Sequence, residues 1–470
     1  MSSLADATPA IALGSLDGRY RSAVAPLVDH LSEPALNRAR IHVEIEWLIH
    51  LTDHEVVPGV RRLSDAEKQQ LRQIVDDFDS AAIEELATTE RVTQHDVKAV
   101  EYFLKKRLAE IAPAAEDAGL AELIHFACTS EDINNLSYAL MVQGAVGTVW
   151  LPTASAVVDV VAQMAREMRE IPLLAHTHGQ PATPTTLGKE LAVLAWRLGR
   201  QLRRIGRTEY LGKLNGATGT YGAHLAAVPG ADWPAVSRSF VEGLGLQWNP
   251  LTTQIESHDW QAELYADVAR FNRILHNLCT DVWTYISMGY FAQVRGQGTV
   301  GSSTMPHKVN PIRFENAEAN LEVSNALLDV LASTLVSSRL QRDLTDSSMQ
   351  RNIGTAFGHS LLALDNVSRG LAGLDPVPAA MAADLDGNWE VLGEPIQSAM
   401  RALGAQGVPG MEEPYERLKE LTRGRRIGQA ELVEFVRGLG LPGEVEERLA
   451  AMTPQTYVGL APELVDLLES

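Results

Sequence analysis

Apolar residues recur at intervals of three or four positions over long stretches of this chain. The pattern is most regular over residues 93–111, 186–206 and 312–336, and it predicts helices there. In the second stretch, the residues that share one face are Leu187, Leu191, Leu194, Leu198, Leu202 and Ile205. We find no convincing run of alternating apolar and polar residues and no strand–helix–strand rhythm. The chain is therefore predicted to be all-α, with mostly long helices packed as a bundle.

Three segments rich in glycine and proline interrupt the helical pattern. Residues 112–119 and 373–378 are predicted to be domain boundaries, whereas residues 404–414 form a loop inside the last domain. The predicted domains are an N-terminal helical domain over 1–115, a central long-helix bundle over 116–370 and a C-terminal helical domain over 371–470.

The composition, 45% hydrophobic and 21% charged over 470 residues, is typical of a globular protein with an ample core. The formal net charge of −20 argues against broad electrostatic binding of nucleic acid. An anionic substrate is still compatible with it. A local cluster of Arg and Lys dominates the field nearby, because screening acts within about 8 Å at physiological salt.

The sequence contains few features that indicate the cellular compartment. Cys128 and Cys279 are too few for a disulfide framework and fit a reducing cytoplasm. Residues 1–20 lack the basic start and long apolar core of a signal peptide. We find no stretch that approaches the ~20 apolar residues of a membrane helix. We therefore expect a cytoplasmic protein that does not enter a membrane.

The densest group of reactive side chains lies in residues 301–311, which read GSSTMPHKVNP. Gly301 permits a backbone turn, and the two prolines stiffen the segment. Asn310 followed by Pro311 is typical of a helix N-cap and first turn. A loop with hydroxyls and a lysine thus leads into a helix N-terminus. Such an arrangement can bind an anion and present a reactive hydroxyl.

Three other polar segments combine a capping group with a following helix. Residues 93–96 (TQHD, capped by Thr93) and 129–132 (TSED) have the capping-box spacing, and residues 177–184 (THGQPATP) precede a helix that Thr185 could cap. Plain helix capping explains any one segment. It does not explain the glycines of the set, or why two of these segments carry a histidine.

His178 lies in a loop bounded by proline rather than inside a helix. Imidazole titrates near neutrality, which suits proton transfer. A structural histidine bonded to the backbone is the alternative. His176 and His178 together also allow a metal site, but two histidines without further clustered ligands are weak evidence for one.

Two familiar motifs are rejected. Residues 296–301 (GQGTVG) match the dinucleotide-binding pattern letter for letter, but no clear strand precedes them and Pro306 would break the helix that should follow. Glycine hinges in a loop fit the sequence better. The Gly-x-Ser-x-Gly elbow of serine hydrolases is absent.

Further polar residues occur in the second half of the chain. Residues 212–219 (GKLNGATG) form a Gly-rich turn, and Gln254 and His258 precede an amphipathic helix. Arg342 and Arg351 lie among hydroxyl and acidic residues, and guanidinium groups in such a setting can clamp a carboxylate or phosphate. A salt-bridged helix surface is the alternative.

Together these segments resemble the fumarate-releasing lyases, the superfamily of fumarase, aspartase, argininosuccinate lyase and adenylosuccinate lyase. Residues 301–311 look like the signature loop of that superfamily. Within it, the chain resembles the adenylosuccinate lyases of bacterial type, through blocks spread over nearly its whole length. The blocks are 17–20 (DGRY), 95–103 (HDVKAVEYF), 126–135 (FACTSEDINN), 177–184, 301–311, 341–347 (QRDLTDS) and 414–424 (PYERLKELTRG).

The resemblance implies a three-domain, fumarase/aspartase-like fold and a homotetramer whose active sites draw on three subunits. It implies β-elimination of fumarate from adenylosuccinate, giving AMP, and from succinylaminoimidazole carboxamide ribotide, giving AICAR, in purine nucleotide synthesis. Nucleotides are the implied small-molecule partners. The implied reaction needs no metal and no organic cofactor.

The resemblance also implies residue roles. Ser302 would be the general base, and His178 would be the general acid, oriented by Glu315. Lys308 would stabilise charge on the substrate carboxylate. The implied substrate-binding residues are Arg19, Tyr20, His95, Asp96, Thr129, Ser130, Gln254, Lys308, Val309, Asn310, Asn316, Arg342, Ser347, Ser348 and Arg351.

The chain departs from the family pattern at Gln94, where asparagine is expected, and at Leu340, where tryptophan is expected. The run 348–351 is unusual, and 404–413 looks longer than in relatives. The first departure puts a binding role for Gln94 in doubt. Two alternatives stay open, another fumarate-releasing lyase and a non-catalytic helical scaffold. The intact catalytic set argues against the second.

Overall fold

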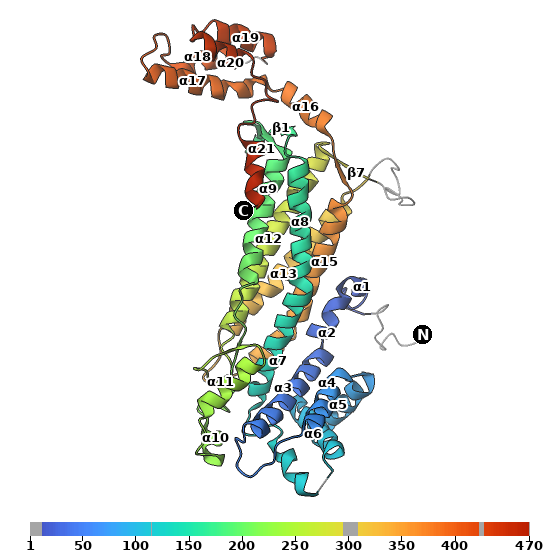
Figure 1. The fold of residues 1–470 in the computed structure, drawn as a ribbon. Helices are drawn as coiled ribbons and strands as arrows, with labels where there is room; N and C mark the ends of the chain where they lie inside the picture. The colour runs from blue at the N-terminus through green and yellow to red at the C-terminus, as the bar shows by residue number, and fades with distance from the viewer. Residues whose placement is uncertain (1–11, 114, 295–308, 423–426, 470) are drawn as a thin grey trace, which may run out of the picture. The chain divides into compact units, whose positions relative to one another are not determined.

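The computed structural model describes residues 12–113, 115–294, 309–422 and 427–469, and helices dominate these ranges (Figure 1). The predicted all-α class is confirmed. The chain divides into two compact units. Unit 1 comprises Met1–Ala154, Gln201–Arg273 and Ala319–Ala363, and unit 2 comprises Ser155–Arg200, Ile274–Glu318 and Leu364–Ser470. The division of the sequence into three domains stays a prediction.

Most elements belong to one unit. Unit 1 contains α1 (Arg21–Val24), η1 (Ala25–Leu27), α2 (Val28–Leu31), α3 (Glu33–Asp53), α4 (Asp65–Asp76), α5 (Ser80–Thr93), α6 (Asp96–Ile111), η2 (Ala115–Leu123), α7 (Ser130–Ala145), η3 (Val146–Trp150), β5 (Leu211–Gly212), α10 (Gly222–Ala227), α11 (Trp233–Gly243), β6 (Gln247–Trp248) and α14 (Thr345–Gln350). Unit 2 contains β1 (Pro172–Leu173), β2 (His176–Thr177), β3 (Gln180–Pro181), β4 (Thr185–Thr186), β7 (Phe291–Gln293), β8 (Leu374–Pro376), α16 (Pro378–Asp386), η4 (Trp389–Leu392), α17 (Gly393–Ala405), α18 (Pro414–Thr422), α19 (Gln429–Arg437), α20 (Gly443–Ala450), α21 (Ala461–Leu464) and η5 (Val465–Glu469). The helices with residues in both units are α8 (Leu151–Glu167), α9 (Leu187–Ile205), α12 (Asp259–Ser287), α13 (Ile312–Leu335) and α15 (Ile353–Leu371).

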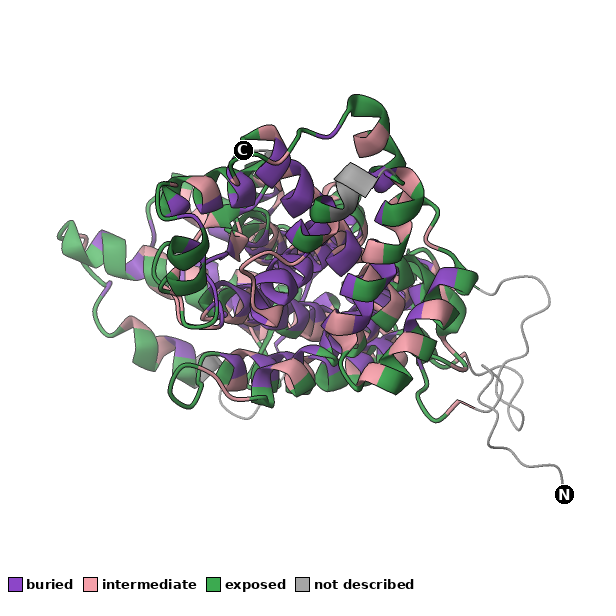
Figure 2. Cartoon of the chain, turned by 90° about the horizontal axis from the view of Figure 1, so that it is seen from below, coloured by how far each residue is buried: buried purple, intermediate pink, exposed green. Residues whose placement is uncertain are grey.

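The helices predicted from apolar spacing are present as α6, α9 and α13. Figure 2 shows buried positions on the faces that the helices turn toward one another, as amphipathic spacing requires. In unit 1 the ring of Trp150 packs edge-on against Phe271 and Phe357, with centroids 5.2 and 6.4 Å away. Full burial of a phenylalanine stabilises the fold by roughly 1.5–3 kcal/mol.

A chain of polar side chains crosses the interior of unit 1. Trp150 donates its indole N–H to Ser360 Oγ at 2.9 Å, and Ser360 donates to Asn272 Oδ1 at 2.8 Å. Asn272 Nδ2 donates in turn to Ser324 Oγ at 3.1 Å, and Ser324 donates to the carbonyl of Ala356 at 2.8 Å. The chain joins η3, α12, α13 and α15. Each member satisfies a buried group that would otherwise cost about 1–3 kcal/mol.

The strands of the described residues are short and form four separate pairs. Three pairs are antiparallel and one, β5 with β6, is parallel. The pair β2–β3 is a hairpin whose two connecting residues, His178 and Gly179, have φ of 53° and 73°. Two positive φ values in a two-residue loop are typical of a type I′ turn. A strained turn thus holds the histidine that the sequence analysis singled out.

Two predicted caps are replaced by a neighbouring side chain, and a third, Asn310, is wrong because α13 begins at Ile312 directly after Pro311, whose carbonyl accepts from the N–H of Glu315. Thr93 is the last residue of α5, and left-handed Gln94 (φ 51°) separates it from α6, so His95 caps α6 by accepting from the backbone N–H of Lys98. At α9 the cap is Thr186, whose Oγ1 accepts from Lys189 N at 3.2 Å. Its neighbour Thr185 donates to Glu190 instead. In both cases the side chain nearest the helix start caps it.

One helical stretch is more apolar than the sequence analysis recognised. Over the described residues, Ser130–Glu167 is long and apolar enough to cross a membrane by length and composition, with a mean hydropathy of 1.5 in its 18-residue window. One such helix is weak evidence for a membrane span, because the core helix of a soluble protein passes the same test. This stretch buries Glu131, Asp132 and Asn134 against other polar groups, as a core helix would.

Candidate functional site

The start of α7 is fixed by a buried carboxylate. Asp132 Oδ2 accepts from the backbone N–H of Thr129 at 2.9 Å, in the cap position that the sequence predicts. The other oxygen, Oδ1, accepts from Lys213 Nζ at 2.8 Å and from the N–H of Asn215 at 2.9 Å. The Gly-rich turn 212–219 is thereby tied to the helix N-terminus that presents Thr129 and Ser130.

The start of α6 lies beside two arginines. Asp96 Oδ2 is 2.7 Å from Arg40 Nη2 and 3.4 Å from Arg351 Nη2. Burial opposes ionisation of Asp96, but the two guanidinium groups and the Val97 N–H outweigh it and lower the pKa of this carboxyl. Asp96 is thus held as a carboxylate next to His95, which caps the same helix.

A second cluster forms around Arg342, whose side chain is mostly buried. Its Nη2 donates to Glu131 Oε1 at 2.9 Å and to Ser347 Oγ at 3.1 Å, and its Nη1 donates to Gln254 Oε1 at 3.3 Å. The structure therefore brings together Gln254, Arg342 and Ser347, three residues expected to bind the substrate. They come from segments separated by up to about ninety positions in sequence.

Four more expected binding residues belong to unit 1. Arg351 donates to the carbonyl of Ser347 at 3.2 Å, and Ser348 lies in the same short helix, α14. Arg19 lies over the ring of Tyr20, 5.8 Å from its centroid. Tyr20 packs against a small apolar cluster that includes Leu362 of α15. The Leu362 side chain of α15 thus supports the segment that carries Tyr20.

The expected residues of unit 2 are less closely grouped. His178 is exposed at the turn of its hairpin, and within the described residues no hydrogen bond joins it to Glu315. Glu315 Oε1 accepts from Trp283 Nε1 at 3.2 Å. Asn310 precedes α13, in which Asn316 lies, and the carbonyl of Val309 accepts from Gln293 at 2.8 Å. Ser302 and Lys308 lie outside the described residues.

The sequence analysis missed two buried residues of this region. Arg40 and Glu131 are each 2% exposed, and both contact residues expected to bind substrate. Arg40 lies inside the long helix α3, where a basic residue is ordinarily surface-exposed. The position of Glu131 in the first turn of α7 could have indicated a contact with a basic residue. An acidic residue there is explained equally well by its favourable interaction with the helix dipole.

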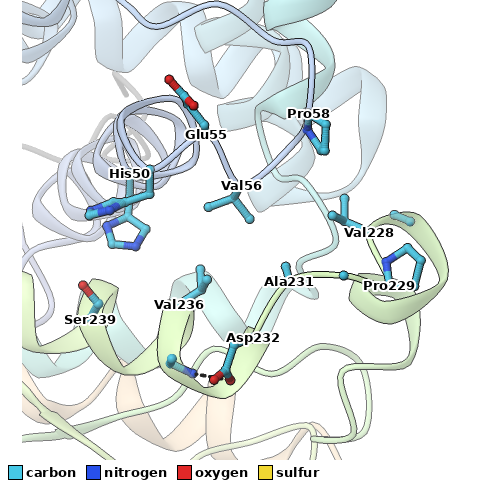
Figure 3. Close-up of a pocket in the computed structure, with 14 residues that line it drawn as sticks. His50, Glu55, Val56, Pro58, Val228, Pro229, Ala231, Asp232, Val236 and Ser239 are labelled. Carbon is cyan, nitrogen blue, oxygen red and sulfur yellow. Dashed lines mark hydrogen bonds between the residues drawn. The ribbon is translucent and has the colours of Figure 1, made fainter.

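A pocket of about 680 Å³ lies elsewhere in unit 1 (Figure 3). It is lined by the end of α3 and by residues around the start of α11, including His50, Val56, Val228 and Asp232. His50 and His54 form a His-x-x-x-His pair that the sequence analysis overlooked, with ring centroids 4.3 Å apart. Burial, and then the nearby His54, lower the pKa of His50 to about 4. None of the expected site residues lines this pocket.

Over the described residues no group of three or more His, Cys, Asp or Glu side chains could hold a metal ion. The imidazole of His176 is 3.2 Å from the carbonyl oxygen of Leu174. The backbone-bonded alternative was considered for His178, and this contact concerns its neighbour His176 instead.

Two family models match the chain. A model described as "Lyase" matches residues 18–323, and one described as "Adenylosuccinate lyase C-terminal" matches residues 338–458. Among curated relatives, the adenylosuccinate lyase of Escherichia coli (strain K12) is 49% identical over 97% of this chain and 98% of its own length. Those of Vibrio cholerae and Legionella pneumophila are 49% and 44% identical, with the same coverage.

Solved structures share the fold. A fumarate lyase from Mesorhizobium sp. BNC1 superimposes with a TM-score of 0.75 at 18% identity, covering 94% of this chain and 97% of its own. The 3-carboxy-cis,cis-muconate lactonizing enzyme from Pseudomonas putida gives a TM-score of 0.69 at 20% identity, with coverages of 93% and 97%. At these identities the likeness concerns the fold alone.

Proposed function

The chain belongs to the adenylosuccinate lyases, and from that membership we propose how its residues carry out the reaction. The enzyme releases fumarate from adenylosuccinate to give AMP, and from succinylaminoimidazole carboxamide ribotide to give AICAR, in purine nucleotide synthesis. The observation that carries the assignment is 49% identity over 97% of the chain to a curated adenylosuccinate lyase.

The chemistry requires a base and an acid on opposite sides of a carbon–nitrogen bond. Ser302 removes the proton from the carbon next to a substrate carboxylate, the electron pair forms the carbon–carbon double bond of fumarate, and the carbon–nitrogen bond breaks. His178 delivers a proton to the departing nitrogen, which is a poor leaving group without it. The hydroxyl is a poor base unless its alkoxide is stabilised, and Lys308 supplies the positive charge for that.

Lys308 and Asn310 meet the charge on the substrate carboxylates, and Asn310 precedes α13, whose N-terminus favours an anion. Thr129, Ser130 and Gln254 contact the succinyl end, and His95 and Asp96 line the site. The phosphate and ribose contact Arg19, Tyr20, Arg342, Ser347 and Arg351. The hydrogen bond of 3.1 Å from Arg342 to Ser347 within unit 1 supports the assignment of these two residues to the same part of the substrate.

Active sites are shared among subunits of a homotetramer. Within one chain His178 is exposed and Glu315 bonds to Trp283, so the proposed His178–Glu315 contact would form between subunits. Exposed apolar side chains support association. On α13, Val323 and Val330 are 45% and 42% exposed and lie seven residues apart, on one face. On α9, Val193 and Trp196 are 44% and 43% exposed.

The protein acts in the cytoplasm, without binding nucleic acid or membrane. Both cysteines are free thiols, which fits a reducing compartment.

The assay that tests the function follows fumarate and AMP released from adenylosuccinate by the purified enzyme. We expect equal amounts of the two products, and activity with the imidazole ribotide as well. Argininosuccinate, aspartate and malate serve as comparison substrates. Fumarate from one of these alone would assign another lyase of the superfamily, and fumarate from none would favour a non-catalytic scaffold.

A further inference from the structure

Behind the expected phosphate-binding residues of unit 1 lie three buried polar residues, Glu131, Asn134 and Arg40, with no role in the reaction described above; they connect two residues that have one. The connected set runs from Arg342 through Glu131 and Asn134 to Arg40, and from there to Asp96. The contacts come from α3, α6, α7 and the segment between α13 and α15. Because this set of buried groups contacts an expected binding residue at each end, it can fix the orientation of those binding side chains.

Glu131 makes the central contact. Its side chain is 2% exposed, and its Oε1 accepts from Arg342 Nη2 at 2.9 Å and from Asn134 Nδ2 at 2.7 Å. Asn134 Oδ1 accepts from Arg40 Nε at 2.9 Å, so the amide is fixed from both sides. A carboxylate held in this way cannot change position without breaking several bonds at once. It is a rigid anchor, and Arg342 is the flexible side chain attached to it.

Arginine has many rotamers, and ordering its side chain costs about 2 kcal/mol of conformational entropy. If that ordering occurred only on substrate binding, it would weaken the affinity for phosphate. Here the Arg342 guanidinium is already fixed on one edge by Glu131 and Ser347 and on the other by Gln254. Binding then proceeds without the ordering cost.

We propose that Glu131 is a positioning residue, which holds the Arg342 guanidinium in the orientation that receives the substrate's phosphate. The inference rests on the proposed function, in which Arg342 meets that phosphate. Its consequence is specific. Loss of Glu131 impairs the use of nucleotide substrates and spares the same substrate without its phosphate group, because the nucleoside has nothing for Arg342 to bind.

The test compares kcat/KM for adenylosuccinate with kcat/KM for the dephosphorylated nucleoside, succinyladenosine. Two variants distinguish the effect of the length of the Glu131 side chain from the effect of its negative charge. Glu131→Asp keeps the charge but withdraws the carboxylate by one methylene, and Glu131→Gln keeps an acceptor oxygen at the same reach. We expect E131D to lower the nucleotide-to-nucleoside ratio by roughly 10-fold or more, mostly through KM. We expect E131Q to stay within about 3-fold of wild type.

A matched control is Glu101→Gln on α6. Glu101 is also a buried carboxylate, paired with Lys98 at 2.7 Å and Lys105 at 3.2 Å, and it contacts no expected binding residue. Its loss should lower stability and leave the ratio unchanged. An E131D enzyme that loses nucleotide and nucleoside activity equally, or keeps the wild-type ratio, overturns the inference. If E131D fails to fold, Glu131→Ala takes its place: a nucleotide-to-nucleoside ratio lowered toward that of Arg342→Ala supports the inference, and a wild-type ratio overturns it.

Different results would contradict the proposed function and the role of Glu131. A wild-type enzyme that releases no fumarate from adenylosuccinate removes the proposed function and the inference with it. A wild-type enzyme that is active but does not prefer nucleotide over nucleoside overturns the inference alone.

Discussion

Lys213 Nζ lies 2.8 Å from Asp132 Oδ1, and neither side chain is exposed to solvent. The pair joins the Gly-rich turn 212–219 to the start of α7, where Asp132 also accepts from the N–H groups of Thr129, Asn215 and Gly216. A buried ion pair contributes little net stability on its own, but removal of one partner leaves the other charge uncompensated.

We therefore expect Lys213→Ala to lower the free energy of unfolding by about 3 kcal/mol or more, measured by urea denaturation. The control is Arg91→Ala, because the Arg91–Glu84 pair at 2.8 Å is exposed on both sides and should change stability by less than about 1 kcal/mol. Equal effects of the two substitutions would show that the buried pair does not hold the turn.

Replacement of either proposed proton carrier should abolish most activity. Ser302→Ala and His178→Ala are each expected to lower kcat by ~10²-fold or more, because each removes a proton-transfer step from the transition state. His176→Ala is the matched control, since His176 lies in the same hairpin and its imidazole is 3.2 Å from the Leu174 carbonyl oxygen. Near-normal turnover by either folded variant would exclude the role assigned to that residue.

Mixing these two inactive variants tests whether the sites are shared. If Ser302 and His178 of one site come from different subunits, reassembled mixed oligomers regain about one quarter of the wild-type sites at equal ratio, one half multiplied by one half. Fumarate release after subunit exchange is the measurement. Mixtures that stay inactive after exchange, verified by mass, would indicate that both residues of a site belong to one chain.

The stability of unit 1 should depend on pH through His125. Its Nδ1 is 2.6 Å from Oε1 of the fully buried Glu44. Burial lowers the pKa of His125, but the bond and the charge of Glu44 outweigh burial and raise it above 6.5. The folded state thus binds the proton more tightly than the unfolded chain does. The stabilisation is complete below the unfolded pKa, about 6.5, and disappears as pH rises through the higher folded value.

His125→Asn isolates this contribution, because asparagine tolerates the φ of 60° found at this position. We expect the loss in unfolding free energy, relative to wild type, to be larger near pH ~6 than near pH ~9. A loss that is the same at both pH values would mean that the pair is not linked to protonation.

The helices could be predicted from the sequence. Which residues cap them, and which distant residues contact one another, could not. The spacing of Leu187, Leu191 and Leu198 reports burial directly, because each helix repeats its own pattern. Caps failed at Thr93 and Thr185, where a neighbouring side chain also had the geometry to cap and local sequence could not rank the two. Arg342 and Glu131 are 211 positions apart, so their contact depends on how the helices pack rather than on either segment alone.

The motif residues are a separate case. The roles given to His178 and Lys308 through the family resemblance follow from the matched segments 177–184 and 301–311 and not from periodicity or spacing. The supporting residue Arg40 belongs to no motif that we used, and burial inside α3 is what distinguishes it.

The hydrogen-bonded chain from Trp150 to Ser324 has a further consequence for the binding segment. A shift of one of its helices by one turn, about 5.4 Å, would break several of these hydrogen bonds at once. Amide, hydroxyl and indole groups would then be buried in the apolar interior without hydrogen-bond partners. The helices α13 and α15 are therefore locked in one register within unit 1. The segment between them, which contains α14 and carries Arg342, Ser347 and Arg351, therefore has its two ends held at a fixed distance from each other.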